Sequence, residues 1–158
     1  MPTRVSEALV RGAVLVRRDC TSFSETIETL VAAMSEAGAL SSDLRQPAAL
    51  QVREREAISS TAMVEINVSI PHTRMDGLDH ITAAIAVSPS AVYEVTDGLP
   101  ISIVVLVLTP SDLVNEHLEF LSRLSMLLQS AQLRRQLQHA GTADEVLMAI
   151  RENERDGA

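Results

Sequence analysis

The sequence of 158 residues predicts an α/β fold with three layers, α/β/α, in which helices flank both faces of a central β-sheet. Three observations support this class. Apolar residues follow helical spacing before residue 60, they alternate or run continuously between residues 64 and 108, and they return to helical spacing after residue 115. A block of strands between two groups of helices is typical of a sheet that is covered on both sides.

The first third of the chain predicts one short strand and two helices. The expected elements are a strand at 13–16, a helix from Ser22 to about Gly38, and a helix from Asp43 to about Ala57. Ser22 and Glu25 have the spacing of a capping box, which indicates where the first helix begins. Ser42 is expected to cap the second helix.

The middle of the chain predicts strands at Val64–Ile70, Ile81–Val87 and Ile101–Leu108. The first segment alternates apolar and polar residues, which indicates a half-buried strand, and Pro71 should end it because proline cannot donate to a ladder. The third segment is almost wholly apolar and should lie in the middle of the sheet. Asp97-Gly98 indicates a turn before it.

The last third predicts three helices. Asn115 is the expected N-cap of the first, and four leucines should line its buried face: Leu118, Leu121, Leu124 and Leu128. A short helix is expected within 129–139. Thr142 and Glu145 form a second capping box, which should open the final helix.

The composition limits the classes of function. A net charge of −8 makes nucleic acid and anionic membrane surfaces poor partners. The single cysteine, Cys20, excludes an internal disulfide. All 13 basic residues are arginine, which excludes chemistry that depends on a Schiff-base or P-loop lysine.

No part of the sequence indicates a membrane segment. The apolar runs are far shorter than the ~20 residues that a spanning helix needs, and the start of the chain lacks the apolar run of a signal peptide. We therefore expect residues 1–158 to form a single cytoplasmic domain that does not insert into a membrane.

Two histidines are candidates for catalysis. His72 follows Pro71, which stiffens the backbone before it. His117 is expected in the first turn of a helix, where free amides and the helix dipole favour an anion. Considered separately, a histidine at either position is more often a hydrogen-bonded structural side chain than a catalytic one.

Other polar residues are weaker candidates from spacing alone. Arg55 belongs to the charge run Arg53–Glu56, which is typical of a solvated helix face. Ser60 and Thr61 are ordinary turn residues. No histidine spacing supports a metal site, and no nucleotide motif is present, so neither a metal nor a cofactor is expected.

Several short segments together resemble a known family. They are Arg55-Glu56, Ser60-Thr61, Ile70-Pro71-His72, Asp97-Gly98 and Asn115-Glu116-His117-Leu118. In order and spacing they are similar to the enzyme IIA domain of the bacterial phosphotransferase system, in its fructose, mannitol and nitrogen-regulatory class (type 2). The resemblance runs from about Ile27 to Glu152 and implies the mannitol/fructose-type enzyme IIA fold, with a mixed central sheet.

The resemblance also implies a mechanism. His72 matches the histidine that accepts a phosphoryl group from the histidine-containing phosphocarrier protein, and His117 matches the second histidine, which steadies that group. Arg55 and Thr61 are expected to stabilise the phosphoryl group. The segment between Thr61 and His72 departs from the family pattern, because it has no glycine and is about one residue longer.

Four functions remain open at this point. The chain could pass the phosphoryl group to an enzyme IIB domain for sugar uptake, or signal through its phosphorylation state to regulatory targets, as a nitrogen-regulatory enzyme IIA does. A non-catalytic module with the same fold is a third reading. A hydrolase that uses His72 as a base ranks last, because no nucleophile or metal is identifiable.

Overall fold

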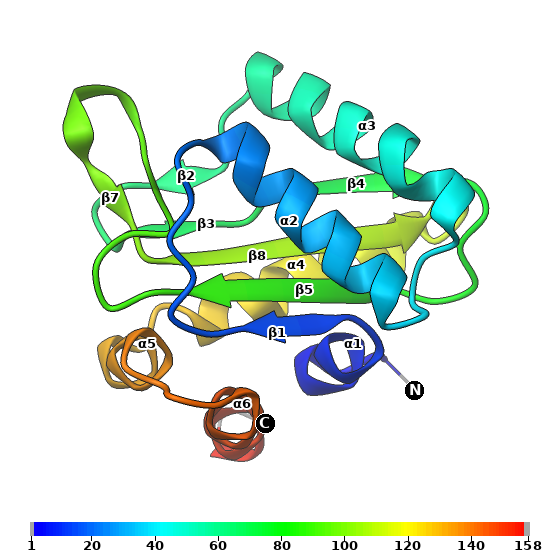
Figure 1. Cartoon of the computed structure of the whole chain (residues 1–158). Coiled ribbons are helices and arrows are strands. Elements are labelled where there is room, and N and C mark those ends of the chain that lie inside the picture. The colour runs from blue at the N-terminus through cyan, green and yellow to red at the C-terminus, as the bar shows by residue number, and fades with distance from the viewer. Residues whose placement is uncertain (1, 157–158) are drawn as a thin grey trace.

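The computed structural model describes residues 2–156, without the side chains of Asp97 and Asp156. A mixed β-sheet lies between two layers of helices, which confirms the predicted α/β/α fold (Figure 1). In chain order, the elements are α1 (Val5–Arg11), β1 (Ala13–Leu15), α2 (Phe23–Glu36), the 3-10 turn η1 (Ser42–Leu44), α3 (Arg45–Ile58), β2 (Ala62–Met63), β3 (Val68–Ser69), β4 (His72–Met75), β5 (Thr82–Val87), β6 (Tyr93–Glu94), the 3-10 turn η2 (Thr96–Gly98), β7 (Pro100–Ile101), β8 (Ile103–Pro110), α4 (Val114–Leu127), α5 (Ala131–Gln138) and α6 (Ala143–Asp156).

The longest strand, β8, lies in the middle of the sheet. The strand order is β1-β5-β8-β3-β2, and β4 also pairs with β8. Strands β3 and β4 run parallel to β8, whereas β5 runs antiparallel to it. Every residue of β8 is buried, which confirms the central position predicted for the apolar run. The predicted strand Ile101–Leu108 is wrong at its start, because Ile101 belongs to β7 and pairs with Tyr93 in a separate two-stranded sheet.

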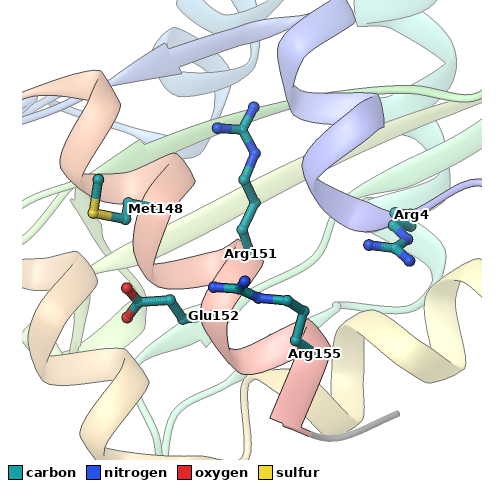
Figure 2. A pocket seen from close by; sticks show the side chains of 5 residues that line it. All are labelled: Arg4, Met148, Arg151, Glu152 and Arg155. Carbon is teal, nitrogen blue, oxygen red and sulfur yellow. The ribbon is translucent and has the colours of Figure 1, made fainter.

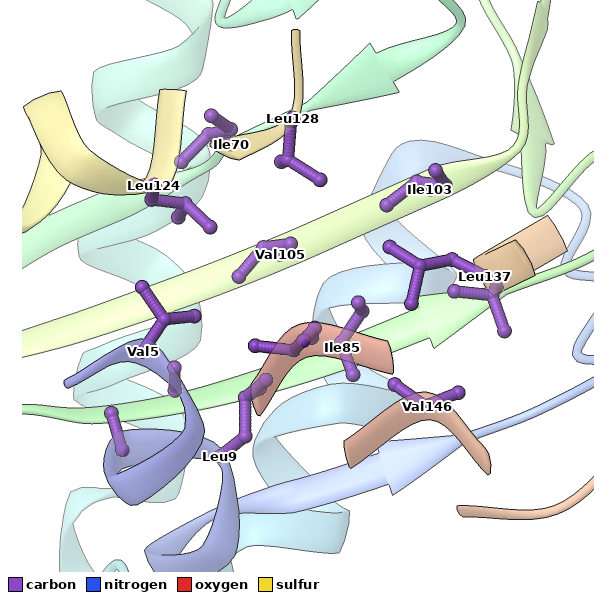
Figure 3. Close-up of a cluster of buried hydrophobic side chains, with 14 of the residues drawn as sticks. Val5, Leu9, Ile70, Ile85, Ile103, Val105, Leu124, Leu128, Leu137 and Val146 are labelled. Atoms are coloured by element: carbon purple, nitrogen blue, oxygen red, sulfur yellow. The ribbon is translucent and has the colours of Figure 1, made fainter. Parts of the chain in front are cut away.

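Each face of the sheet has its own apolar core. Side chains of α1, α4, α5 and α6 cover one face, where β8 contributes Ile103, Val105 and Val107 (Figure 3). Helices α2 and α3 cover the other face, where β8 contributes Val104, Leu106 and Leu108. The period of two along β8 therefore supplies both cores from one strand.

Each predicted capping box forms only its N-cap bond, because the glutamate carboxylate accepts from the residue before the cap, Thr21 for Glu25 and Gly141 for Glu145. The Ser22 hydroxyl accepts a hydrogen bond from the Glu25 backbone N–H (3.1 Å) at the start of α2. The Thr142 hydroxyl accepts one from the Glu145 backbone N–H (3.1 Å) at the start of α6. The cap predicted at Ser42 is wrong, because Ser41 caps a 3-10 turn there, before α3 begins at Arg45.

The strand predicted at Val64–Ile70 is wrong over its first half. A turn separates β2 from β3, and Asn67 adopts a left-handed backbone with φ of 61°. The Asn67 carbonyl accepts hydrogen bonds from Ser102 and Ile103, which ties this turn to the start of β8. Val64 and Ile66 pack against opposite cores, so their alternation reflects packing on two sides rather than a continuous strand.

The prediction for the start of α4 is also wrong by two residues. Leu113, not Asn115, is the N-cap, and it makes no side-chain capping bond. The buried face of the helix consists of His117, Phe120 and Leu124, followed by Leu128, while Leu118 is 61% exposed. The first buried residue of this helix is a histidine, so a pattern of apolar residues does not identify it as buried.

Helix α1 was not expected from the sequence. It has seven residues, and its side chains Val5, Ala8 and Leu9 are buried against the core. The Glu154 carboxylate accepts hydrogen bonds from the backbone N–H groups of Val5 (2.7 Å) and Ser6 (3.2 Å). The cap comes from a residue 149 positions away, so tertiary contacts rather than local sequence support this short helix.

The turn between α1 and β1 requires glycine. A Cβ atom at Gly12 would lie 1.8 Å from the carbonyl oxygen of Ala83 in β5, so the backbone would have to move. We expect Gly12→Ala to lower the free energy of unfolding by about 3 kcal/mol, the cost of strong overpacking, as measured by urea denaturation. In the matched control Gly141→Ala the new Cβ has only contacts at 3.8 Å. An equal loss in both variants would contradict the steric explanation.

One buried hydroxyl has no partner among the described residues. The side chain of Thr82, at the start of β5, is 3% exposed, and its Oγ1 makes no hydrogen bond. Thr82 pairs with Leu108 across the central strand pair.

Candidate functional site

His72 is the first residue of β4, in a strand path that Pro71 interrupts without changing its register. Val68 and Ser69 pair with Ile103 and Val104, and His72 pairs with Val107, so β3 and β4 follow β8 in one register. Pro71 cannot donate, but its carbonyl still accepts from Val107 N–H (3.0 Å). His72 therefore continues the edge of the sheet, rather than standing beyond a strand end.

The backbone fixes the tautomer of His72. Its Nδ1 lies 2.7 Å from the carbonyl oxygen of Ile70. A carbonyl oxygen can only accept, so Nδ1 carries the proton and donates it. In the neutral ring, the free nitrogen with a lone pair is then Nε2. His72 is partly exposed, and no hydrogen bond of Nε2 is present within the described residues.

The structure brings His117 to His72 although 45 positions separate them in the sequence. The ring centroids lie 5.4 Å apart, and the rings are tilted by 57°. His117 is only 4% exposed, in the first turns of α4, and its Nδ1 lies 2.7 Å from the hydroxyl of Thr109 in β8. Strand β4 thus contributes His72, strand β8 contributes Thr109 and helix α4 contributes His117 to a small polar cluster.

Both imidazoles are held neutral. Burial lowers the pKa of His72, and the Arg55 charge lowers it further, against the opposing effects of the Ile70 carbonyl and Glu56. Burial, together with smaller effects of His72, Arg74 and Arg55, lowers the pKa of His117 to about 4. At pH 7 neither ring carries a proton on both nitrogens, so each offers one lone pair and one N–H.

Two arginines place positive charge near the histidines. Arg55 is exposed in the last turn of α3, and its guanidinium makes no hydrogen bond or ion pair within residues 2–156. Arg74 follows two positions after His72 in β4, and its guanidinium donates to the Ser111 carbonyl (2.7 Å). In a chain of net charge −8, these cations favour an anion at this place.

Thr61 makes hydrogen bonds with Glu56 rather than with the histidines. Its hydroxyl donates to Oε1 of Glu56 (2.8 Å), and its backbone N–H donates to Oε2 of the same carboxylate (2.8 Å). The Ser60 hydroxyl also donates to Glu56 (3.1 Å). Three donors thus hold the carboxylate of Glu56, the acidic group that raises the pKa of His72.

The cluster suits nucleophilic attack on an anionic electrophile. His72 supplies a lone pair without a separate base, and His117 and Arg55 supply donors and positive charge beside it. Sequence reasoning missed Thr109, Arg74 and the Ile70 carbonyl. In the sequence, Thr109 is distinguished only as a polar residue near the end of an apolar strand. Such residues are also common where they have no function.

The remaining candidate ligands do not join this cluster. His80 is exposed in a loop, and His139 is the C-cap of α5. Among residues 2–156 no three histidine, cysteine, aspartate or glutamate side chains are placed to hold a metal ion. The described helices also include none with the length and apolarity needed to cross a bilayer.

A separate surface pocket of about 350 Å³ lies beside α6 and the residue before α1 (Figure 2). Its lining residues are Arg4, Met148, Arg151, Glu152 and Arg155. None of the site residues predicted from the sequence lines it, and its charged side chains are exposed.

Comparisons with known proteins agree on one group. The model of the family described as "Phosphoenolpyruvate-dependent sugar phosphotransferase system, EIIA 2" matches residues 8–153, a longer stretch than the motifs alone indicated. The chain is 29% identical over 153 residues to the fructose-specific EIIABC component of Bacillus subtilis, which covers 96% of this chain. It spans only 24% of that protein's length.

Two solved structures extend the comparison. The nitrogen regulatory protein IIA-Ntr from Neisseria meningitidis is similar with a TM-score of 0.75 and 26% identity, over 92% of this chain and 98% of that one. The mannitol enzyme IIA from Escherichia coli, in complex with phosphorylated enzyme IIB, has a TM-score of 0.67. It is 16% identical, over 88% of this chain and 94% of that one, so it supports the fold alone.

Proposed function

Because this chain belongs to the EIIA 2 family of the phosphoenolpyruvate-dependent sugar phosphotransferase system, we propose that it carries a phosphoryl group on His72 from one protein partner to another. The observation that carries this proposal is the pairing of His72, whose Nε2 is free to attack, with the buried His117 at a centroid distance of 5.4 Å. The family consists of phosphotransferase components, and a histidine pair of this kind fits their chemistry.

The proposed step moves a phosphoryl group between two imidazoles. Nε2 of His72 attacks the phosphorus of a phosphohistidine on the donor protein. The new P–Nε2 bond forms as the donor's P–N bond breaks, and the donor ring, which carries a proton on its other nitrogen, loses its positive charge and leaves as neutral imidazole. The proton on Nδ1 of His72 stays in place, where the Ile70 carbonyl stabilises the positive charge that the ring gains. No metal or additional base takes part.

The surrounding residues act on the charge of the transferring group. Its transition state is loose and spreads negative charge over three oxygens, so catalysis depends on alignment and electrostatic stabilisation. His117 donates an N–H to these oxygens, and Arg55 neutralises them with its free guanidinium. Thr61 contributes through Glu56, because its two hydrogen bonds hold that carboxylate and reduce its repulsion of the phosphoryl group.

The proposed partners are proteins on both sides of the transfer. The donor is the histidine-containing phosphocarrier protein. For sugar uptake, the acceptor is an enzyme IIB domain, and the similar Escherichia coli mannitol protein was solved in complex with such a partner. Similarity to a fructose-specific component supports this transport role.

A second candidate is regulation through the phosphorylation state. The structure of a nitrogen regulatory protein is similar over 92% of this chain, at 26% sequence identity. This similarity favours the regulatory role. In this reading the same chemistry at His72 changes the affinity of the protein for regulatory targets, and no enzyme IIB partner is needed.

A labelling experiment tests the proposal. The full chain is incubated with phosphoenolpyruvate, enzyme I and the histidine phosphocarrier, and the label is mapped by mass spectrometry under alkaline conditions. We expect one acid-labile phosphoryl group, on His72, and nuclear magnetic resonance (NMR) of the product should place it on Nε2. No label, or label only on His80 or His139, would leave a binding module that retains the fold without the relay.

A further inference from the structure

Thr109 lies where it can control the second histidine. It is fully buried in β8, and its hydroxyl lies 2.7 Å from Nδ1 of His117, which is its only side-chain partner among the described residues. A β-branched side chain in a central strand has little rotational freedom. The hydroxyl is therefore a fixed point against which the His117 ring is oriented.

Two arrangements of protons fit this distance. If Nδ1 of His117 donated to the hydroxyl, the hydroxyl proton of Thr109 would remain buried with no acceptor in the described part of the chain. If the hydroxyl donates to Nδ1 instead, the buried proton of Thr109 is paired, and the ring proton lies on Nε2, which is not among the buried side-chain atoms without a partner in the described residues. An unpaired donor that is fully buried costs more than one that is not, so the second arrangement is favoured.

The second arrangement also gives the two histidines opposite tautomers. The Ile70 carbonyl, which can only accept, keeps the proton of His72 on Nδ1 and leaves Nε2 bare. The Thr109 hydroxyl, which can donate, keeps Nδ1 of His117 bare and leaves the proton on Nε2. One ring then presents a nucleophile and the other presents a donor, on rings that are 5.4 Å apart.

We propose that Thr109 is a positioning residue that holds His117 as the Nε2–H tautomer, so that this N–H meets the phosphoryl group on His72. The role of this contact in phosphoryl transfer rests on the proposed function. The tautomer of His117 itself can be measured without any phosphoryl donor. The lowered pKa of His117 agrees with a ring that stays neutral.

The test compares the wild-type chain with three threonine variants by imidazole ¹⁵N NMR at neutral pH. We expect His117 to be the Nε2–H tautomer in the wild type and in Thr109→Ser, which keeps the hydroxyl. Thr109→Val removes only the hydroxyl, and His117 should then become a mixture of tautomers. Thr82→Val is the matched control, because it deletes a buried hydroxyl that has no partner among residues 2–156.

Phosphoryl transfer from the histidine phosphocarrier provides the second readout. Thr109→Val should lower the transfer rate by roughly 10-fold, the lower end of the effect of removing a partner that orients a histidine, and Thr109→Ser should restore it. A wild-type His117 protonated on Nδ1, or an unchanged tautomer in Thr109→Val, overturns the proposal even if one variant folds poorly. A wild-type chain that accepts no label overturns the proposed function instead.

Discussion

Replacing His72 by glutamine abolishes the acid-labile label that the wild-type chain should accept from the histidine phosphocarrier. Glutamine preserves much of the side-chain length and an N–H donor that can bond to the Ile70 carbonyl, but its amide nitrogen has no lone pair available for attack on phosphorus. The rate should fall below detection, because no other imidazole in the cluster has an exposed bare nitrogen. The measurement is incorporation of phosphoryl label at equal protein concentration.

The matched control for this variant is His80→Gln. His80 is exposed in a loop, so its replacement makes the same chemical change outside the cluster. Full labelling of His80→Gln together with none in His72→Gln would assign the acceptor. Undiminished labelling of His72→Gln would show that another residue receives the phosphoryl group.

Replacing His117 by alanine should slow the transfer by about 100-fold without abolishing it. Loss of one preorganised donor to a developing anion costs about 10²–10³ in rate, and the lower value applies because Arg55 still supplies charge. His72 keeps its bare Nε2, so the label should still appear, on the same residue, after longer incubation. The measurement is the single-turnover rate with excess phosphorylated donor.

A stability measurement must accompany this variant. His117 is buried, and its removal leaves a cavity and an unpaired hydroxyl on Thr109. Thermal unfolding shows whether the fold persists, and His117→Gln, which restores an N–H donor, should recover part of the rate. Equal rates for His117→Ala and the wild type would remove His117 from the mechanism.

The fold was predictable where local patterns and tertiary packing agree. The run that ends at Leu108 is apolar on both sides because two helical layers cover β8, and this shows directly in the sequence. The turn before β3 was not predictable, because Val64 and Ile66 are both partly buried, against opposite cores, without belonging to a strand. Alternating apolar and polar residues indicate that every second residue is buried, and a half-buried strand is only the commonest cause.

The site was predictable in its residues more than in its geometry. The segments around His72 and His117 carry the family resemblance, but the distance between their rings depends on how α4 packs on the sheet. Helix periodicity placed Leu118 on the buried face because it is apolar, whereas the buried position belongs to His117. The contact of Thr109 with His117 is purely tertiary and left no separate pattern in the sequence.

The position of β4 has a consequence for the solubility of this protein. Within the described residues β8 is its only strand partner, so β4 forms part of the sheet's edge, where exposed backbone groups invite edge-to-edge aggregation. Three features oppose such pairing: the strand has only four residues, Pro71 lacks an N–H at its start, and the exposed Arg74 carries charge. His72 can therefore lie on an accessible edge without offering that edge as a template for intermolecular β-sheet growth.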